Sequence, residues 1–164
     1  MKPRRAPPPE ESPKDRSPRD RSPGESWHGY RVEEQIGYLI RRAHQRASSI
    51  FDAVMQEFGV TPVQFAALAK LHDLGPTSQN QLGRLVGIDP ATMYGVAGRL
   101  TRRGLVSTMP DSGDARLVLL DLTEAGRGIV EAMKSRGAEV TARTLAPLST
   151  EEARILNRLL ARLG

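Results

Sequence analysis

Cysteine is absent from all 164 residues of this sequence. Its absence excludes disulfide bonds, thiolate metal sites and an oxidation switch based on cysteine. No run of about 18 apolar residues is present, so no segment is predicted to cross a membrane. The Pro-rich, charged N-terminus also lacks the apolar core of a secretory signal. We therefore expect a cytoplasmic protein that does not bind a membrane.

Motifs for catalysis and metal binding are missing as well. The sequence contains no Gly-x-Ser-x-Gly, no phosphate-binding loop and no dinucleotide fingerprint. Its three histidines, His28, His44 and His72, do not have the spacing of metal ligands. Neither an enzyme nor a protein with a metal or another cofactor is expected.

Positive charge is in modest excess. The net charge of +5 favours a polyanionic partner. Residues 1–26 supply +2 of it, from seven basic and five acidic residues, which leaves +3 for residues 27–164. Because the excess on the second part is small, any affinity for nucleic acid must come from local clustering of basic residues.

The first 26 residues differ in composition from the rest. They hold seven of the twelve prolines and a short repeat, Asp-Arg-Ser-Pro, at 15–18 and 20–23. Such a segment cannot bury enough apolar surface to offset its ordering entropy, so we expect a disordered tail. Two roles remain open for it: a solvated tail, or a basic arm that adds phosphate contacts.

A long helix is predicted from Val32 to Phe58, where apolar residues recur at steps of three and four. Gly59 follows it in the position that favours glycine after a helix. A helix of this length carries an apolar stripe that needs a partner. We expect part of the stripe to pack against a second copy of the chain.

Further helices and two strands are predicted after residue 60. Capping residues, helix-opening prolines and stop glycines mark their ends. The helices run from Pro62 to His72, from the Ser78 cap to Val86 with Leu82 and Leu85 inward, from Pro90 to Arg103, from Thr123 to the break at Pro147, and from the capping box at 149–152 to Leu163. The strands are Leu105–Met109 and Leu117–Leu122, joined by turn formers at 110–113.

This order predicts a mainly α fold with a small β-wing. Two short helices with a tight break between them, followed by a hairpin with an exposed Arg, have the layout of a winged helix-turn-helix. We assign the winged helix-turn-helix lobe to residues 61–122 within a domain of residues 27–164.

The same region resembles the MarR family of bacterial transcriptional regulators. The wing pattern of that family, Asp-x-Arg, then a strand and Leu-Thr-x-x-Gly, is matched by Asp114, Arg116, Leu122, Thr123 and Gly126. The exit of its recognition helix, Arg-Leu-x-x-x-Gly-Leu-Val, is matched by Arg99, Leu100, Gly104, Leu105 and Val106. The resemblance covers about residues 32–163 and leaves the tail outside.

The resemblance implies a ligand-responsive repressor that works as a homodimer. Residues 32–58 and 123–163 are then interlocking dimerisation helices, and two recognition helices bind a pseudo-palindromic operator in double-stranded DNA. It also implies a small aromatic acid as effector. Residues 64–72 and 78–84 are more specifically similar to the MarR-type repressors of nicotinate degradation, which respond to a hydroxylated nicotinate.

Candidate DNA contacts lie on the predicted recognition helix, at the start of the preceding helix and on the hairpin. Arg116 is placed to enter the narrow minor groove, and Asp114 either orients its guanidinium or is an ordinary turn residue. The alternatives are a solvated surface for the charged residues and a simple helix cap for Ser78. The full set is Ser78, Gln79, Asn80, Pro90, Ala91, Thr92, Tyr94, Gly95, Arg99, Arg102, Asp114 and Arg116.

A pocket for an aromatic acid needs a cation, one or two hydroxyls and an aromatic wall. Residues of these kinds border the apolar helix stripes, but helix periodicity does not decide whether their side chains point into a common pocket. For His44 and His72 a structural, partly buried histidine is the alternative. The set is Tyr38, Arg42, His44, Ser48, Phe65 and His72.

Two functions of other classes remain open. A winged helix that binds a partner protein would keep its affinity when Arg99 and Arg116 are neutralised. An architectural DNA binder would lose its affinity when residues 1–26 are deleted, and it would distinguish little between sequences.

Overall fold

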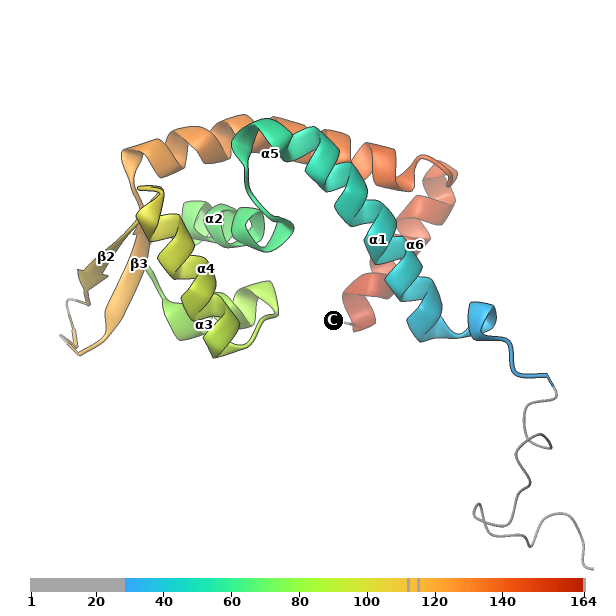
Figure 1. Ribbon diagram of the computed structural model, residues 1–164, viewed down its shortest axis with the longest axis horizontal. Helices are drawn as coiled ribbons and strands as arrows, with labels where there is room; N and C mark the ends of the chain where they lie inside the picture. Colours follow the sequence, from blue (N-terminus) through green and yellow to red (C-terminus); the bar gives the residue numbers. More distant parts are fainter. Residues whose placement is uncertain (1–28, 112, 115, 164) are drawn as a thin grey trace, which may run out of the picture. The chain divides into compact units, whose positions relative to one another are not determined.

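The computed structural model describes residues 29–111, 113–114 and 116–163 (Figure 1). The chain divides into two compact units, one ending at Ile40 and the other beginning at Arg41. The predicted tail of residues 1–26 and His28 lie outside the described residues, so the expectation for the tail stays a prediction. None of the helices in the described ranges is long and apolar enough to cross a membrane.

The long helix predicted over Val32–Phe58 is wrong at both ends. A 3-10 turn, η1 (Val32–Glu34), precedes α1 (Ile36–Met55), and a second one, η2 (Gln56–Phe58), follows it. At the first end, Gln35 has an extended backbone, and its side-chain amide donates a hydrogen bond to the carbonyl oxygen of Arg31. This local bond competes with the helical hydrogen bonds. At the second end the helix tightens into 3-10 geometry, as helix ends often do, before Gly59 at φ 58°.

The central helices have the predicted caps. In α2 (Pro62–Leu74), Thr61 and Gln64 form a reciprocal capping box. The hydroxyl of Ser78 caps α3 (Gln79–Val86), and the carboxylate of Asp89 caps α4 (Pro90–Arg102). Gly87, at φ 71°, ends α3 in the left-handed conformation that glycine adopts without strain.

A small antiparallel sheet completes the lobe. Its order is β1 (Thr77–Ser78), β3 (Val118–Leu122), β2 (Val106–Pro110), with Leu120 opposite both Thr77 and Thr108. The strand β1 was not predicted, because two residues are too few to show an alternating pattern. Pro110 ends β2 rather than opening the loop. It lies in the edge strand β2, where a missing N–H is tolerated.

Two helices follow the hairpin. The hydroxyl of Thr123 caps α5 (Glu124–Leu145), and the predicted capping box between Ser149 and Glu152 opens α6 (Thr150–Leu163). Figure 1 shows α2, α3 and α4 grouped beside the β2–β3 hairpin. The apolar core lies among these elements and α5, with Leu68, Leu71, Met93 and Met133 fully buried. The lobe is therefore held by one core, and α6 adds no buried residue to it.

Candidate nucleic-acid interface

The pair α3–α4 is packed tightly enough to act as one rigid unit. A Cβ on Gly83 would lie 3.2 Å from the carbonyl oxygen of Ile88 and 3.4 Å from the Cβ of Met93. The turn between the helices is closed by hydrogen bonds from the amides of Gly87 and Ile88 to carbonyls of α3. Two short helices joined by such a turn form a helix-turn-helix, with α4 in the position of the recognition helix.

The outer face of α4 carries most of the residues predicted to contact DNA. Met93, Val96, Ala97 and Leu100 face the core. Tyr94 has 73% of its surface exposed, although it is a large aromatic residue. Pro90, Ala91, Thr92, Arg99 and Arg102 are exposed as well, and Gly95 is half-buried.

The arginines of α4 lie back along the helix over glycines. A Cβ on Gly95 would lie 3.4 Å from Nη1 of Arg99, and a Cβ on Gly98 would lie 3.7 Å from Nη1 of Arg102. Neither guanidinium forms a hydrogen bond or ion pair with another described residue. Both are therefore free to bind an external anion such as a DNA phosphate.

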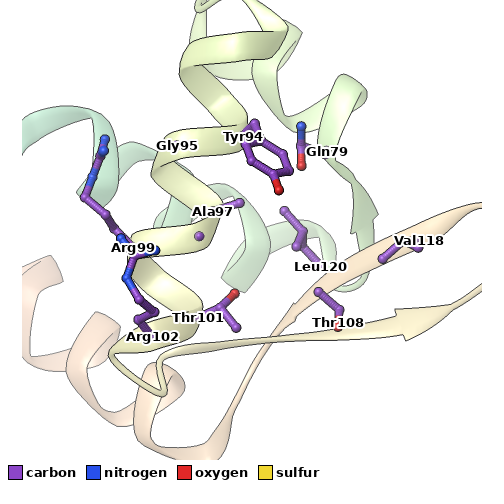
Figure 2. A pocket seen from close by; sticks show the side chains of 11 residues that line it. Gln79, Tyr94, Gly95, Ala97, Arg99, Thr101, Arg102, Thr108, Val118 and Leu120 are labelled. Atoms are coloured by element: carbon purple, nitrogen blue, oxygen red, sulfur yellow. The ribbon is translucent and has the colours of Figure 1, made fainter.

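A hollow of about 580 Å³ lies between α4 and the sheet. Figure 2 shows Tyr94 and Gln79 on one side of α4 and Arg99 and Arg102 on the other. Near the sheet its lining side chains are mainly apolar, and on α4 they include the arginines Arg99 and Arg102. The lining is formed by Gln79, Tyr94, Gly95, Ala97, Gly98, Arg99, Thr101, Arg102, Thr108, Val118 and Leu120.

The two helix caps modify the predictions for Ser78 and Thr92. The hydroxyl of Ser78 accepts a hydrogen bond from the amide of Gln81 at 3.4 Å, which is the role of a cap. The hydroxyl of Thr92 donates its hydrogen to the carboxylate of Asp89 at 2.6 Å. The side chain of Thr92 can therefore offer DNA only the lone pairs of its hydroxyl oxygen and its methyl group. This bond and the one from the amide of Thr92 lower the pKa of Asp89. Gln79 is half-buried, and Asn80 beside it is exposed.

The wing tip is organised by two aspartates. The carboxylate of Asp111 accepts hydrogen bonds from the amides of Gly113 and Asp114, each at 3.0 Å. The carboxylate of Asp114 accepts one from the backbone amide of Arg116 at 3.0 Å. This bond favours the alternative in which Asp114 is an ordinary turn residue. The two aspartates fix the loop from which the exposed Arg116 extends.

His72 belongs to a charged cluster between α2 and α5. Its Nε2 lies 2.6 Å from the carboxylate of Glu131, and its Nδ1 lies 2.9 Å from Nζ of Lys134. Asp73 completes the cluster, and the hydrogen bonds from His72 and Lys134 lower its pKa. Both ring nitrogens of His72 are occupied by protein groups, which favours the structural alternative for this histidine.

The other predicted ligand residues lie on α1, except Phe65, which lies on α2. The hydroxyl of Ser48 lies 3.5 Å from Nε2 of His44, one turn away on α1, whereas Arg42 is exposed on nearly the opposite side of the helix. The ring of Phe65 on α2 instead contacts that of Phe51, with 5.9 Å between centroids. Tyr38 belongs to the first unit and the remaining residues to the second.

Arg103 is a residue that sequence reasoning missed. Its guanidinium donates hydrogen bonds to the carbonyl oxygens of Phe58 and Gly59, both at 2.7 Å. A basic residue directly after a helix and before Gly104 is a pattern that could have indicated helix-end contacts. Its partners 44 and 45 residues away could not be read from the sequence.

Comparison with known proteins agrees with this geometry. The MarR family model matches residues 60–118, which include α2 to the start of β3. NicR, an HTH-type transcriptional repressor from Pseudomonas putida, is 37% identical over 123 residues, which are 75% of this chain and 78% of NicR.

Two solved structures are similar over 82% of this chain, both with a TM-score of 0.78. One is a probable transcriptional regulator from Pseudomonas aeruginosa, which is 43% identical and matched over its full length. The other is BpsR from Bordetella bronchiseptica, which is 36% identical, is matched over 96% of its length and is described as having its DNA binding regulated by 6-hydroxynicotinic acid. With its helix-turn-helix, exposed recognition face and wing, the chain belongs to the MarR family of DNA-binding transcriptional regulators, which are not enzymes.

Proposed function

We propose that this chain represses transcription as a homodimer that binds a pseudo-palindromic operator and leaves it when a small aromatic carboxylate binds. The observation that carries the DNA-binding part is the exposed face of α4, which presents Tyr94 and two arginines that form no hydrogen bond or ion pair with another described residue. The similarity to the repressor NicR supports repression. A regulator of this kind acts where the DNA is, in the cytoplasm.

In this proposal each copy reads DNA with two elements. The helix α4 enters the major groove, and Arg116 at the wing tip enters the adjacent minor groove, where the potential is most negative. Arg99 and Arg102 bind phosphates and set the position of the helix. Because α4 offers few side chains that could hydrogen-bond to bases, DNA shape contributes much of the specificity.

The dimer is supported by an apolar face that the single chain leaves open. Leu156, Leu159, Leu160 and Leu163 of α6 are between 36% and 72% exposed. We assign residues 32–58 and 123–163 to the dimer and residues 61–122 to DNA binding. A two-fold dimer places the two copies of α4 about one DNA turn apart, roughly 34–36 Å.

The effector is proposed to be a hydroxylated nicotinate or a similar aromatic acid. The support is the similarity to BpsR, whose DNA binding is regulated by 6-hydroxynicotinic acid. In this chain His44 and Ser48 lie one turn apart on an accessible side of α1 and offer two hydrogen-bonding groups for such an acid, and Arg42 is an exposed cation on nearly the opposite side of the helix. A hundredfold preference of the effector for the non-binding state would supply about 2.7 kcal/mol of coupling.

The test is a titration of labelled duplex from around the protein's own gene, at fixed salt, with and without 6-hydroxynicotinate. Nicotinate, which lacks the hydroxyl, is the matched control compound. Selective binding that only 6-hydroxynicotinate weakens is the expected result. Selective binding that is indifferent to both compounds would reject the effector and keep the regulator.

A further result would reject the operator proposal itself. If no duplex is preferred over an unrelated one at any tested salt concentration, sequence-specific repression fails. Affinity that disappears on deletion of residues 1–26 would then point to architectural binding through the tail.

A further inference from the structure

The side chain of Arg103 links the end of the recognition helix to the turn that follows α1 and η2. Arg103 directly follows α4, and its two terminal guanidinium nitrogens each donate a 2.7 Å hydrogen bond, Nη1 to the carbonyl oxygen of Gly59 and Nη2 to that of Phe58. Both carbonyls belong to the turn that ends η2. One planar group therefore spans two chain segments that are more than 40 residues apart in sequence.

The chemistry of this contact is specific to arginine. The last carbonyls of a helix have no partner within it, and they carry the negative end of the helix dipole. A guanidinium is always charged and presents parallel donors in a rigid fork, so it binds two neighbouring carbonyls in one orientation. Gly59, at φ 58°, turns the chain so that its carbonyl and that of Phe58 both accept from the fork.

The apolar core restrains the same two segments in a different way. Phe51, Met55 and Val60 near the end of α1 pack in one cluster with Val96 and Leu100 of α4. Interdigitated apolar side chains hold the helices together and limit their crossing angle. The two hydrogen bonds from a planar fork add a specific direction at the end of α4.

Arg103 also differs from its neighbours on α4. Arg99 and Arg102 lie over Gly95 and Gly98 and make no hydrogen bond or ion pair with another described residue. Both terminal nitrogens of Arg103 already bind backbone carbonyls. The adjacent arginines at 102 and 103 therefore have different tasks, although the sequence alone does not separate them.

We propose that Arg103 is a positioning residue, which locks the C-terminal end of α4 to the turn after α1 and so sets the orientation in which α4 meets DNA. This inference rests on the proposed function, in which α1 belongs to the dimer and α4 to the DNA-binding lobe. No contact between Arg103 and DNA is required.

The test compares Arg103→Gln with Arg102→Gln in the full-length chain. For Arg103→Gln, the ratio of operator affinity to affinity for an unrelated duplex should fall about tenfold, a loss of about 1.4 kcal/mol. Affinity for the unrelated duplex should stay within about twofold of the wild-type value, and the slope of log K against log salt should be unchanged. For Arg102→Gln, both affinities should fall together and the salt slope should decrease by about one, because a phosphate contact is lost.

A second readout does not depend on DNA. Amide hydrogen exchange should become faster at residues 56–61 and 99–105 in Arg103→Gln and stay as in the wild type in Arg102→Gln. Arg103→Lys keeps the charge but can reach only one carbonyl at a time, so its operator selectivity and exchange rates should lie between those of the wild type and Arg103→Gln. It replaces Arg103→Gln in the comparison if that variant does not fold.

Three outcomes would overturn the positioning role. The first is operator selectivity within about twofold of the wild-type value in Arg103→Gln. The second is a salt slope that falls by about one in the same variant, which would make Arg103 a phosphate ligand. The third is unchanged exchange at both segments. If the wild-type chain prefers no duplex, the proposed function fails, and the exchange comparison alone decides whether Arg103 holds α4 in place.

Discussion

Gly126 lies directly against the carbonyl oxygen of Leu105, so closely that a Cβ at position 126 would collide with it. The neighbouring Thr123 fixes this approach, because its hydroxyl donates to the carbonyl oxygen of Gly104 at 2.6 Å and accepts from the amide of Gly126 at 3.0 Å. The amide of Thr123 donates to the carbonyl of Leu105 at 3.1 Å. The Leu-Thr-x-x-Gly pattern is therefore a joint between the exit of α4 and the start of α5, not a DNA contact.

Replacing Gly126 by Ala should destabilise the fold by about 1–3 kcal/mol, since the first turn of α5 must move away from Leu105. Gly128→Ala is the matched control, because Gly128 is exposed in the same helix and a Cβ there would meet nothing within 4 Å. That substitution should be neutral or stabilise by up to about 1 kcal/mol through helix propensity. Urea denaturation of both variants measures the difference. Equal midpoints would show that the joint is not tightly packed.

The sequence predicted the helix caps and the hairpin because these depend on neighbouring residues. The left-handed glycines at 59 and 87 and the N-cap at Thr61 are local features with strong residue preferences, whereas the reciprocal bond from Gln64 at that cap was not predicted. The inward prediction for Leu85 was wrong, since this side chain is 41% exposed. The short helix α3 faces the core with Leu82 and Gly83, and Leu85 lies outside that sector.

The outward-facing positions of α4 were also predictable, from helix periodicity, but the partners of individual side chains were not. The hydroxyl of Thr92 is used by Asp89, and Asp114 binds a backbone amide. His72 meets Glu131 and Lys134, and Arg103 meets the turn after α1. The contacts of His72 and Arg103 join elements distant in the chain and depend on tertiary packing, which a single sequence does not encode in a readable pattern. Those of Thr92 and Asp114 are local, but a short polar side chain has several local partners to choose from.

Tyr94 is expected to contribute to DNA binding and little to stability. Its side chain is 73% exposed beside the hollow between α4 and the sheet. Tyr94→Ala should therefore change the free energy of unfolding by no more than about 0.5 kcal/mol. It should weaken operator binding about tenfold, equivalent to about 1.4 kcal/mol. Fluorescence anisotropy with labelled operator measures the loss, and Tyr94→Phe separates the hydroxyl from the ring. An unchanged affinity in Tyr94→Ala would remove this residue from the interface.

Arg116→Ala should weaken operator binding and leave the dimer intact. The aspartates at 111 and 114 hold the wing loop through backbone amides, so loss of the Arg116 side chain should not disorder the tip. The effect should be strongest on operators with an A·T-rich minor groove at the wing position, where the negative potential is greatest. Anisotropy with A·T-rich and G·C-rich flanks measures it. Identical losses on both would favour a phosphate contact over entry into the groove.

Acid should weaken the cap of α4. The hydrogen bonds from the hydroxyl and amide of Thr92 hold the pKa of Asp89 below its ordinary value of 3.8. The unfolded chain therefore binds more protons at this position, so the stabilisation is fully present above the unfolded pKa and is lost as pH falls through the folded one. Asn caps helices about as well as Asp but does not titrate. Asp89→Asn should match the wild type near neutral pH and lose less stability toward pH of about 3, as urea midpoints would show. Parallel curves for the two proteins would contradict the role of this carboxylate.

A charge on the open face of α6 should separate the proposed dimer into single chains. Leu160 is 47% exposed in the isolated chain and lies on the same face as Leu156 and Leu163. In a dimer this face would be buried, and Leu160→Lys would place an unpaired charge there, which costs far more than an exposed one.

Asn157→Lys is the control, because it adds the same charge at an exposed position of the same helix. Light scattering after gel filtration should give a single-chain mass for Leu160→Lys and a dimer mass for Asn157→Lys. Operator affinity should fall with the dimer, because a single copy reaches one half-site only. A dimer that survives in Leu160→Lys would place the interface elsewhere than on this face of α6.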